Sequence, residues 1–246
     1  NDRNKIGSIC GTNGTLANTD AEKAEVFNAV FSSVFKKGPS HNEPPYQMFN
    51  DRNHCELNSV SFPPELVERK LSNLKPFSAP RPDGIHPRIL KTCATALKTP
   101  LSLIFEKSMR TGRLPSEWKK TNITPIYKSG KKSFPSNYRP INLSSVPSKI
   151  MESIIKDALL QHLIENELIL PSQHGFMPGK SCSTNLLSYL NEVTSALDKG
   201  IPFDVIMIDF RRAFDVVPFE HMLRKLESHG IVGEVLAWIT DWTRER

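Results

Sequence analysis

Helical periodicity dominates the hydrophobic pattern of this chain. Apolar side chains recur three or four residues apart in stretches that begin at capping residues or prolines and end near lysines or glycines. The pattern predicts helices over residues 20–36, 63–74, 89–98, 101–110, 147–166, 183–199, 218–229 and 233–244. We expect Pro100 to interrupt the third of these before residue 101, because a proline inside a helix removes a backbone hydrogen bond.

Local signals support several of these helices. Thr19 and Glu22 have the spacing of a capping box, and Gly200 follows residues 183–199 as a C-cap. The residues expected to face inward are Ala24, Phe27, Phe31 and Val34 in the first helix, Val67, Leu71 and Leu74 in the second, and Ile150, Ile154, Ala158 and Leu163 in the helix over 147–166.

Two stretches predict strands, residues 121–128 and residues 203–210, of which the second is the stronger. Residues 1–18 and 39–64 have no apolar period and are rich in turn-forming residues, so we interpret them as a loop and a linker. Many helices with few strands indicate a helix-rich α+β fold.

Composition narrows the class of protein. The 246 residues are 38% hydrophobic and 24% charged, as in a globular protein. No apolar run reaches the roughly 18 residues that a membrane span requires. The four cysteines (Cys10, Cys55, Cys93 and Cys182) and seven histidines are scattered, which gives little support to disulfide or zinc frameworks. The chain begins at Asn1 and ends in a helical pattern, so we expect it to be a piece of a longer protein.

Positive charge is concentrated in residues 107–132, which hold eight of the 32 Lys and Arg residues and only one acid, within a chain of net charge +6. This segment is either a surface for nucleic-acid phosphates or a solvated basic face.

Asp209 ends the strongest predicted strand and Asp215 follows after a turn. A carboxylate at a strand end suits a divalent metal in phosphoryl transfer, or it caps the next turn. Phosphatases, nucleases and polymerases all use such acids, so the local pattern does not choose among them.

Three ordered motifs resemble those of a known family. They are YRPINL (138–143), QHGFMPGKSCSTNLL (173–187) and IDFRRAFDVV (208–217). Together they resemble the reverse transcriptase of non-LTR, LINE-type retrotransposons of the jockey-like group. The resemblance extends upstream through residues 82–91 and 112–132. It implies the fingers and part of the palm of a right-hand polymerase over residues 61–246, preceded by a connector, residues 1–60, that follows an endonuclease.

The resemblance assigns roles to single residues. Asp209 would be the catalytic aspartate, and with the carbonyl of Phe210 it would bind Mg²⁺, or Mn²⁺ in its place. The residues that would contact the incoming dNTP are Phe210, Arg211, Arg212, Ala213 and Phe214, with Phe214 excluding a 2′-hydroxyl. Arg139 would contact the incoming nucleotide or the template. The residues that would contact the RNA template are Gln173, Gly175, Phe176, Lys119, Lys120 and Lys128. Plainer alternatives are a core position for Phe214, an acid partner for Arg139 and simple turns at Gly175 and Gly179.

The resemblance also implies an RNA template, a DNA primer and dNTPs as partners, and an intracellular location in the nucleus and in cytoplasmic ribonucleoprotein. The family's x-Asp-Asp motif is absent after Asp215, so we expect the fragment alone to be inactive as a polymerase. Arg81 stands where relatives usually carry glycine. Two other hypotheses are a non-catalytic nucleic-acid-binding remnant and a metal-dependent phosphohydrolase built on Asp209.

Overall fold

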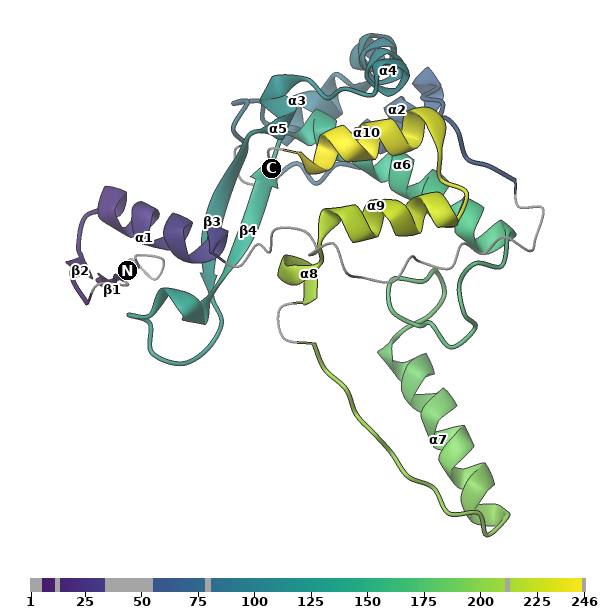
Figure 1. The fold of residues 1–246 in the computed structure, drawn as a ribbon. Coiled ribbons are helices and arrows are strands. Elements are labelled where there is room, and N and C mark those ends of the chain that lie inside the picture. The colour runs from purple at the N-terminus through teal and green to yellow at the C-terminus, as the bar shows by residue number, and fades with distance from the viewer. Residues whose placement is uncertain (1–5, 12–13, 34–54, 78–80, 211–212, 245–246) are drawn as a thin grey trace.

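The computed structural model describes residues 6–11, 14–33, 55–77, 81–210 and 213–244. The strands are β1 (Ile9–Cys10), β2 (Leu16–Ala17), β3 (Thr121–Tyr127) and β4 (Tyr138–Ser144). The helices are α1 (Asp20–Ser32), α2 (Pro64–Ser72), α3 (Pro87–Thr92), α4 (Ala94–Thr111), α5 (Ser116–Lys119), α6 (Val146–Glu165), α7 (Cys182–Asp198), α8 (Ala213–Val216), α9 (Phe219–Ser228) and α10 (Gly233–Thr243). Helices with two small antiparallel sheets confirm the mixed α and β class (Figure 1). Across the described ranges, no helix has the length and apolar character to cross a bilayer.

The helical body, formed by α2, α3, α4, α6, α9 and α10, contains the main hydrophobic core. Phe105 lies at its centre with no exposed surface, and its ring meets Phe62 and Trp118 edge to face at centroid distances of 5.6 and 5.8 Å. The expected inward faces of α2 and α6 are confirmed, with Val67 and Leu71 fully buried in the first and Ile150 and Ile154 buried in the second.

Residues 55–63, which fall inside the expected linker 39–64, are packed against this body. Leu57 forms a parallel bridge with Ile231, and Phe62 is fully buried. The Phe62 amide donates to the Glu106 carboxylate at 2.5 Å, and its carbonyl accepts from the Ser102 hydroxyl at 2.6 Å. The linker prediction is wrong for these residues, because a segment without apolar periodicity can still be buried when its backbone finds hydrogen-bond partners. Residues 34–54 lie outside the described residues.

Pro100 does not interrupt a helix. Helix α4 runs through it, and the break between α3 and α4 falls at Cys93, whose φ and ψ are −94° and 19°. A proline inside a helix costs about 3 kcal/mol or more. Burial of Leu101, Phe105 and Met109 on the same helix offsets that cost, since each large apolar side chain contributes roughly 1.5–3 kcal/mol.

Strands β3 and β4 form one hairpin, in register from Thr121 opposite Ser144 to Tyr127 opposite Tyr138. Strand β3 confirms the prediction over 121–128, whereas β4 was not anticipated because Pro140 interrupts its sequence. Pro125 and Pro140 lie opposite each other. Proline has no amide hydrogen, so both missing donors of the ladder fall at one pair of residues.

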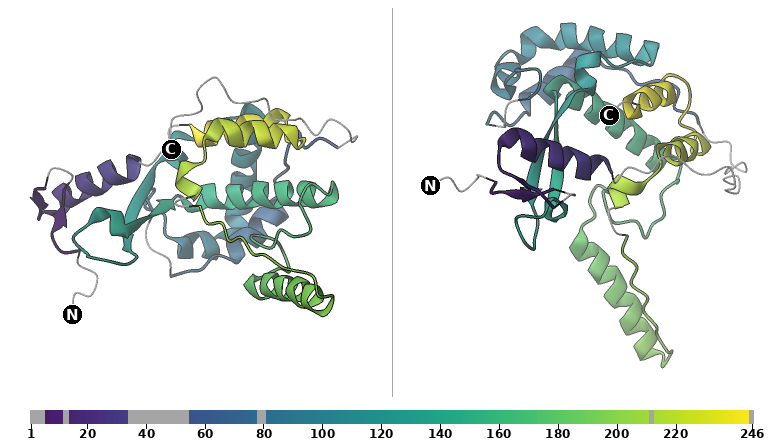
Figure 2. Two further views of the ribbon diagram at one scale, coloured as in Figure 1. Left: turned by 60° about the horizontal axis from the view of Figure 1, so that its bottom comes forward. Right: turned by 60° about the vertical axis from the view of Figure 1, so that its left-hand side comes forward.

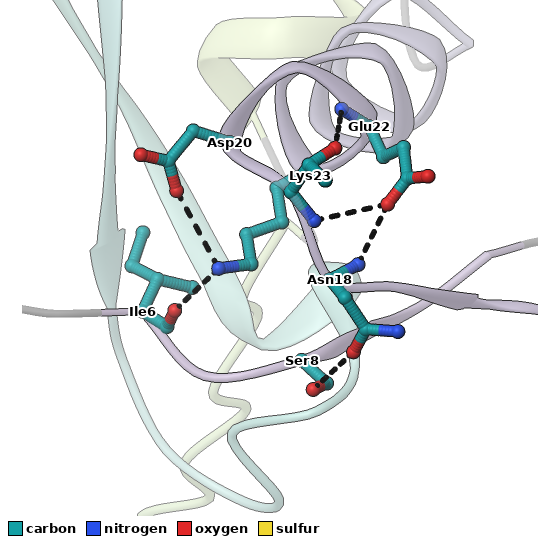
Figure 3. A network of polar contacts seen from close by, with 7 residues as sticks. Ile6, Ser8, Asn18, Asp20, Glu22 and Lys23 are labelled. Carbon is teal, nitrogen blue, oxygen red and sulfur yellow. Dashed lines mark hydrogen bonds and ion pairs between the residues drawn. The ribbon is translucent and has the colours of Figure 1, made fainter.

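Helix α1 packs on this hairpin and on β1 and β2 around a second core, which consists of Ile9, Ala17, Phe27, Phe31 and Tyr138. The expected capping box of Thr19 and Glu22 is present. Phe27 and Phe31 are buried as expected, but the third buried residue of α1 is Lys23, not Ala24. The Lys23 ammonium donates to the Ile6 carbonyl at 2.9 Å (Figure 3).

The prediction of a loop over residues 1–18 is wrong for residues 9–10 and 16–17, which form strands β1 and β2. Ile9 pairs with Ala17, and Cys10 pairs with Leu16, in a two-stranded antiparallel sheet. The Ser8 hydroxyl donates to the Asn18 side chain at 2.7 Å beside it (Figure 3). Strands of two residues are too short for alternation of apolar and polar residues to reveal them.

Residues 182–210 form an arm that projects from the helical body (Figures 1 and 2). It consists of α7, which confirms the helix expected over 183–199, and of residues 201–210, which return beside α7. Residues 201–210 are extended but not paired as a strand with any described segment, so the strand prediction over 203–210 is wrong. The Tyr189 and Phe203 rings, 6.5 Å apart, and the Ile201 amide bonded to Ala196 connect the two parts. A strand needs backbone partners from another segment, which an apolar sequence does not supply by itself.

Candidate functional site

Asp209 and Phe210 lie at the end of the extended part of the arm. Both are exposed, and the apolar residues before them, Ile206, Met207 and Ile208, are 77–86% exposed. The chain then leads into α8 (Figure 1). The expected metal ligands, the Asp209 carboxylate and the Phe210 carbonyl, are therefore on an open part of the molecule.

The expected nucleotide contacts next to them are only partly described. Arg211 and Arg212 lie outside the described residues. Ala213 begins α8, and Phe214 lies in the same short helix, although its side chain is outside the described part. Among the described residues, no three His, Cys, Asp or Glu side chains gather in a way that could hold a metal ion.

Arg139 is found on a different part of the molecule, near the tip of the β3–β4 hairpin. Lys128, Lys131 and Lys132 lie in the connecting turn, and Arg139 is opposite Ile126 in the register. All four cations are exposed. In the part of the chain that the structure describes, Lys128, Lys131 and Arg139 form no ion pair with an acid. We call these four residues the basic tip.

Tyr127 and Tyr138, at the hairpin ends of β3 and β4, both contact Lys132 of the basic tip. Tyr138 is buried, and its hydroxyl donates to the Lys132 carbonyl at 2.8 Å. Burial raises the pKa of the Tyr138 hydroxyl, and the neighbouring Tyr127 raises it further, so this hydroxyl stays a neutral donor. The Lys132 ammonium lies 5.4 Å from the centre of the Tyr127 ring, a cation–π distance. The turn is thus held in shape while its charges point to solvent.

Lys119 and Lys120, two expected template contacts, are both paired with acids. Lys119 donates to Asp241 at 3.0 Å, with both side chains largely buried, and the other oxygen of Asp241 accepts from the Leu114 amide at 2.8 Å. Lys120 pairs with Glu117 at 2.7 Å, but both side chains are about two-thirds exposed. An exposed pair of this kind contributes little and leaves Lys120 accessible to phosphates.

Asp241 connects α10 to the segment that leads into β3. Burial alone would raise the pKa of the Asp241 carboxyl. The Leu114 amide and the Lys119 ammonium outweigh burial and hold this pKa below its ordinary value of 3.8. Lys119 therefore has a structural partner inside the fold, which the density of basic residues in the sequence did not reveal.

Gln173, Gly175 and Phe176 lie in the loop between α6 and α7. The Gln173 side-chain amide donates to the Gly175 carbonyl at 3.0 Å, which folds this side chain back onto its own loop. Phe176 is 87% exposed and has a positive φ of 62°. Sequence reasoning missed Lys180, which bonds back across this loop. A lysine among glycines and prolines was the available signal.

The structure does not bring the candidates together at one place. The hairpin and the arm extend from different sides of the helical body (Figures 1 and 2). A groove of about 640 Å³ lies between α1 and β3 and is lined by residues such as Phe27, Asn28 and Ile123, but by none of the candidates. Most of the expected site is thus divided among three separate features, the arm, the basic tip and the α6–α7 loop, with Lys119 and Lys120 before β3 and Ala213 and Phe214 in α8.

Comparison with known proteins defines the class. Residues 126–245 match the family described as reverse transcriptase (RNA-dependent DNA polymerase). The matched segment begins in β3 and includes the basic tip, the α6–α7 loop and the arm. This match confirms the relationship to reverse transcriptases that the three sequence motifs led us to expect.

The relatives are proteins of non-LTR retrotransposons. The chain is 27% identical over 220 residues to the "Probable RNA-directed DNA polymerase from transposon BS" of Drosophila melanogaster, covering 87% of this chain and 24% of the relative. It is 26% identical over 230 residues to the RNA-directed DNA polymerase from mobile element jockey of the same species, covering 89% and 24%. It is 27% identical over 167 residues to the Pol polyprotein of the type-1 retrotransposable element R2 of Popillia japonica, covering 68% and 22%. The chain thus spans about a quarter of the length of these relatives.

Proposed function

We propose that this chain is the template-binding and nucleotide-binding front part of an RNA-directed DNA polymerase of a non-LTR retrotransposon. The observation that carries the proposal is that the reverse transcriptase match over residues 126–245 includes the basic tip, the α6–α7 loop and Asp209. The substrates would be an RNA template, a DNA primer and dNTPs. In right-hand polymerase terms, residues 61–246 would supply the fingers and part of the palm.

The basic tip suits contacts with template phosphates. Phosphate neutralisation by Lys and Arg supplies most of the non-specific affinity for nucleic acid. Lys128, Lys131 and Arg139 are exposed and form no acid pair among the described residues, whereas Lys119 is held by Asp241. We therefore assign the phosphate contacts to Lys128, Lys131 and Arg139, together with the exposed Lys120, and we assign to Lys119 the role of anchoring the start of β3 to α10.

Asp209 and the Phe210 carbonyl are oxygen donors suited to a divalent metal. Mg²⁺ is usually held by one or two carboxylates together with substrate phosphates and water, so one exposed carboxylate and one carbonyl fit the protein's share of one such site. Mn²⁺ accepts the same ligands. Asp209 and the Phe210 carbonyl would hold this metal, and the chemistry it would supply is activation of the primer 3′-hydroxyl and neutralisation of charge on the triphosphate. A second ion requires further carboxylates.

The residues that follow Asp209 would bind the nucleotide. Arg211, Arg212 and Ala213 would direct backbone N–H groups toward the triphosphate, and Phe214 would lie under the sugar and exclude a 2′-hydroxyl. The closeness of these residues to Asp209 in the chain supports the assignment, since metal and triphosphate must meet. Replacing Phe214 by valine should admit rNTPs, measured as the ratio of rNTP to dNTP incorporation. An unchanged ratio would make Phe214 a core residue.

Two assays test the proposal. In the longer reading frame that we expect to contain this segment, Asp209→Ala should lower magnesium-dependent primer extension on an RNA template by a factor of about a thousand or more, because a metal ligand contributes several kcal/mol. Binding of the template should stay nearly unchanged. Retained extension would remove Asp209 from the metal site.

The second assay uses the chain as it is. Fluorescence anisotropy of a labelled RNA should show binding that weakens steeply with salt. Binding without any extension in the longer frame would favour a non-catalytic nucleic-acid-binding remnant. The phosphohydrolase hypothesis needs further acids around Asp209, and the described residues place none in a metal-binding group with it.

A further inference from the structure

The loop between α6 and α7 is closed by the side chain of Lys180. Its ammonium donates to the backbone carbonyl of Pro171, nine residues earlier in the chain, and to the carbonyl of Gln173 at 2.9 Å. An ammonium group carries three donors and no acceptor, so a single lysine can hold two carbonyls of one loop together. Both carbonyls would lose a charged donor if the Lys180 side chain were shortened.

The remaining contacts of the loop fix its two ends. The Gln173 amide hydrogen donates to the Leu170 carbonyl at 2.9 Å at the start of the loop. At the other end His174 and Thr184 are joined at 3.0 Å, and Thr184 belongs to the capping box of α7. The loop is therefore bonded to the first turn of α7 through His174. Lys180, near the end of the loop, connects back to its beginning at Pro171 and Gln173.

In the chain, Phe176 lies between Gln173, whose carbonyl accepts from Lys180, and Lys180 itself. The Phe176 side chain is 87% exposed, and its φ of 62° places this residue in the left-handed region. That region costs a non-glycine residue about 1–2 kcal/mol, so surrounding bonds must maintain it. An exposed aromatic side chain is a surface on which an unpaired base can stack. The two bonds of Lys180 have a charged donor and cross the loop on either side of Phe176 in the chain, so they help to maintain the backbone that presents Phe176.

We propose that Lys180 is a positioning residue that holds the loop of residues 171–181 and so presents Phe176 as a stacking surface for an unpaired base of the RNA template. Lys180 does not contact the base. It acts through the carbonyls of Pro171 and Gln173. The proposal rests on the proposed function for its ligand, whereas the clamp itself can be measured without any nucleic acid.

The test is a double-mutant cycle on the complete chain. Lys180→Met, Phe176→Ala and the double variant are compared by hydrogen exchange of the loop amides and by anisotropy with a labelled single-stranded oligouridine. Lys180→Arg is the conservative rescue, because it keeps a charged donor. Lys199→Met is the matched control, because it removes one exposed lysine at the opposite end of α7.

We expect Lys180→Met to speed exchange in residues 171–181 and to weaken binding about fivefold or more, as Phe176→Ala does, since base stacking on an aromatic ring is worth that much. The double variant should bind no more weakly than Phe176→Ala alone. Lys180→Arg should restore both readouts. Lys199→Met should change binding within about twofold, the effect of one general charge.

Other outcomes overturn the proposal and separate its parts. Unchanged loop exchange in Lys180→Met means that Lys180 does not position the loop. Additive losses in the double variant mean that Lys180 acts on phosphates directly. Faster exchange with unchanged binding in both single variants removes the stacking role. If the wild-type chain binds no RNA, the proposed function fails, and the stacking role fails with it.

Discussion

Helix α6 and the extended segment 201–210 are both rich in apolar side chains, and the fold treats them differently. In α6, Ile150, Met151 and Ile154 are at most 4% exposed, whereas Ile206 and Met207 in the segment are 85% and 86% exposed. The helix satisfies its backbone internally and needs only a neighbour for one face. The extended segment needs backbone partners as well as cover. The two regions show that hydrophobicity selects burial only where the backbone can also be satisfied.

The buried and exposed regions of the molecule also differ in what we expect them to contribute, stability in the first case and function in the second. The helical body has buried aromatic and aliphatic side chains but none of the residues that we assign to metal, nucleotide or template. Most of these residues lie in the arm, the α6–α7 loop and the basic tip, which are exposed, while Lys120 precedes β3 and Ala213 and Phe214 lie in α8. Substitutions in the body should therefore change the free energy of unfolding, and substitutions in the exposed regions should change binding or catalysis.

The largest effect on stability is expected for Phe105→Ala in the body. Phe105 is fully buried between Phe62 and Trp118, so the cavity and the lost burial should lower the free energy of unfolding by about 3–5 kcal/mol. Urea unfolding followed by circular dichroism measures this change. Leu187→Ala in α7, whose side chain is 65% exposed, is the control and should stay within about 0.5 kcal/mol. Equal losses in both variants would contradict the separation of body and arm.

A smaller effect is expected for Asp241→Ala, which removes the contact between α10 and the start of β3. The Leu114 amide and the Lys119 ammonium both lose their acceptor, so the loss should be about 1–3 kcal/mol. The pKa of Asp241 is lower in the folded protein than its ordinary value. Its contribution is therefore present above about pH 4 and is lost as the pH falls through the lowered pKa.

The measurement is the difference in unfolding free energy between wild type and Asp241→Ala at pH 7 and at decreasing pH. The difference should shrink below about pH 4, because protonation removes the same contact in the wild type. Lys119→Ala should show part of the same loss. A difference that grows on acidification would mean that Asp241 is bound mainly in its protonated form.

At the basic tip we expect an effect on binding rather than on stability. Lys128→Ala should leave the unfolding free energy nearly unchanged and reduce the slope of log K for RNA against log salt by about one. Lys119→Ala is the matched control and should act mainly on stability, because its ammonium is held by Asp241. An unchanged slope for Lys128→Ala would exclude this lysine from the phosphate contacts.

The smallest effect is expected in the arm. Ile206→Lys places a charge at a position that is 85% exposed, so the free energy of unfolding of the chain should change by no more than about 0.5 kcal/mol. Thermal melting by circular dichroism measures it. A loss of several kcal/mol would show that Ile206 is buried in solution and that residues 201–210 have found a partner there.

Much of the local structure could be predicted from the sequence. The capping box at Thr19, the inward face of α2 and the glycine cap after α7 depend on residues close together in the chain. The burial of residues 57–62 could not be predicted in this way, since it depends on Ile231, which is remote in sequence. Strand β4 was missed because Pro140 interrupts its sequence. At Pro100 a local signal led to a wrong prediction. The proline predicts a helix break, but the packing of α4 keeps the helix continuous through it.

The candidate site followed the same division. Asp209, Arg139 and Phe176 could be named from motifs, because residue type and order along the chain are properties of the sequence. Which lysines remain accessible could not, since the partner of Lys119 is Asp241, far away in the chain. The bonds of Lys180 to Pro171 and Gln173 likewise required the folded loop.

The sequence by itself therefore determined the family, the positions of most helices and the identity of the candidate residues. Each of these is encoded in short-range spacing, in caps and in ordered motifs. Only the tertiary structure decided which apolar segments are buried, which cations are paired with acids and how Phe176 is presented. Burial and ion pairing depend on contacts between segments far apart in the chain, and the closure of the α6–α7 loop depends on its folded backbone, so no local pattern specifies these contacts.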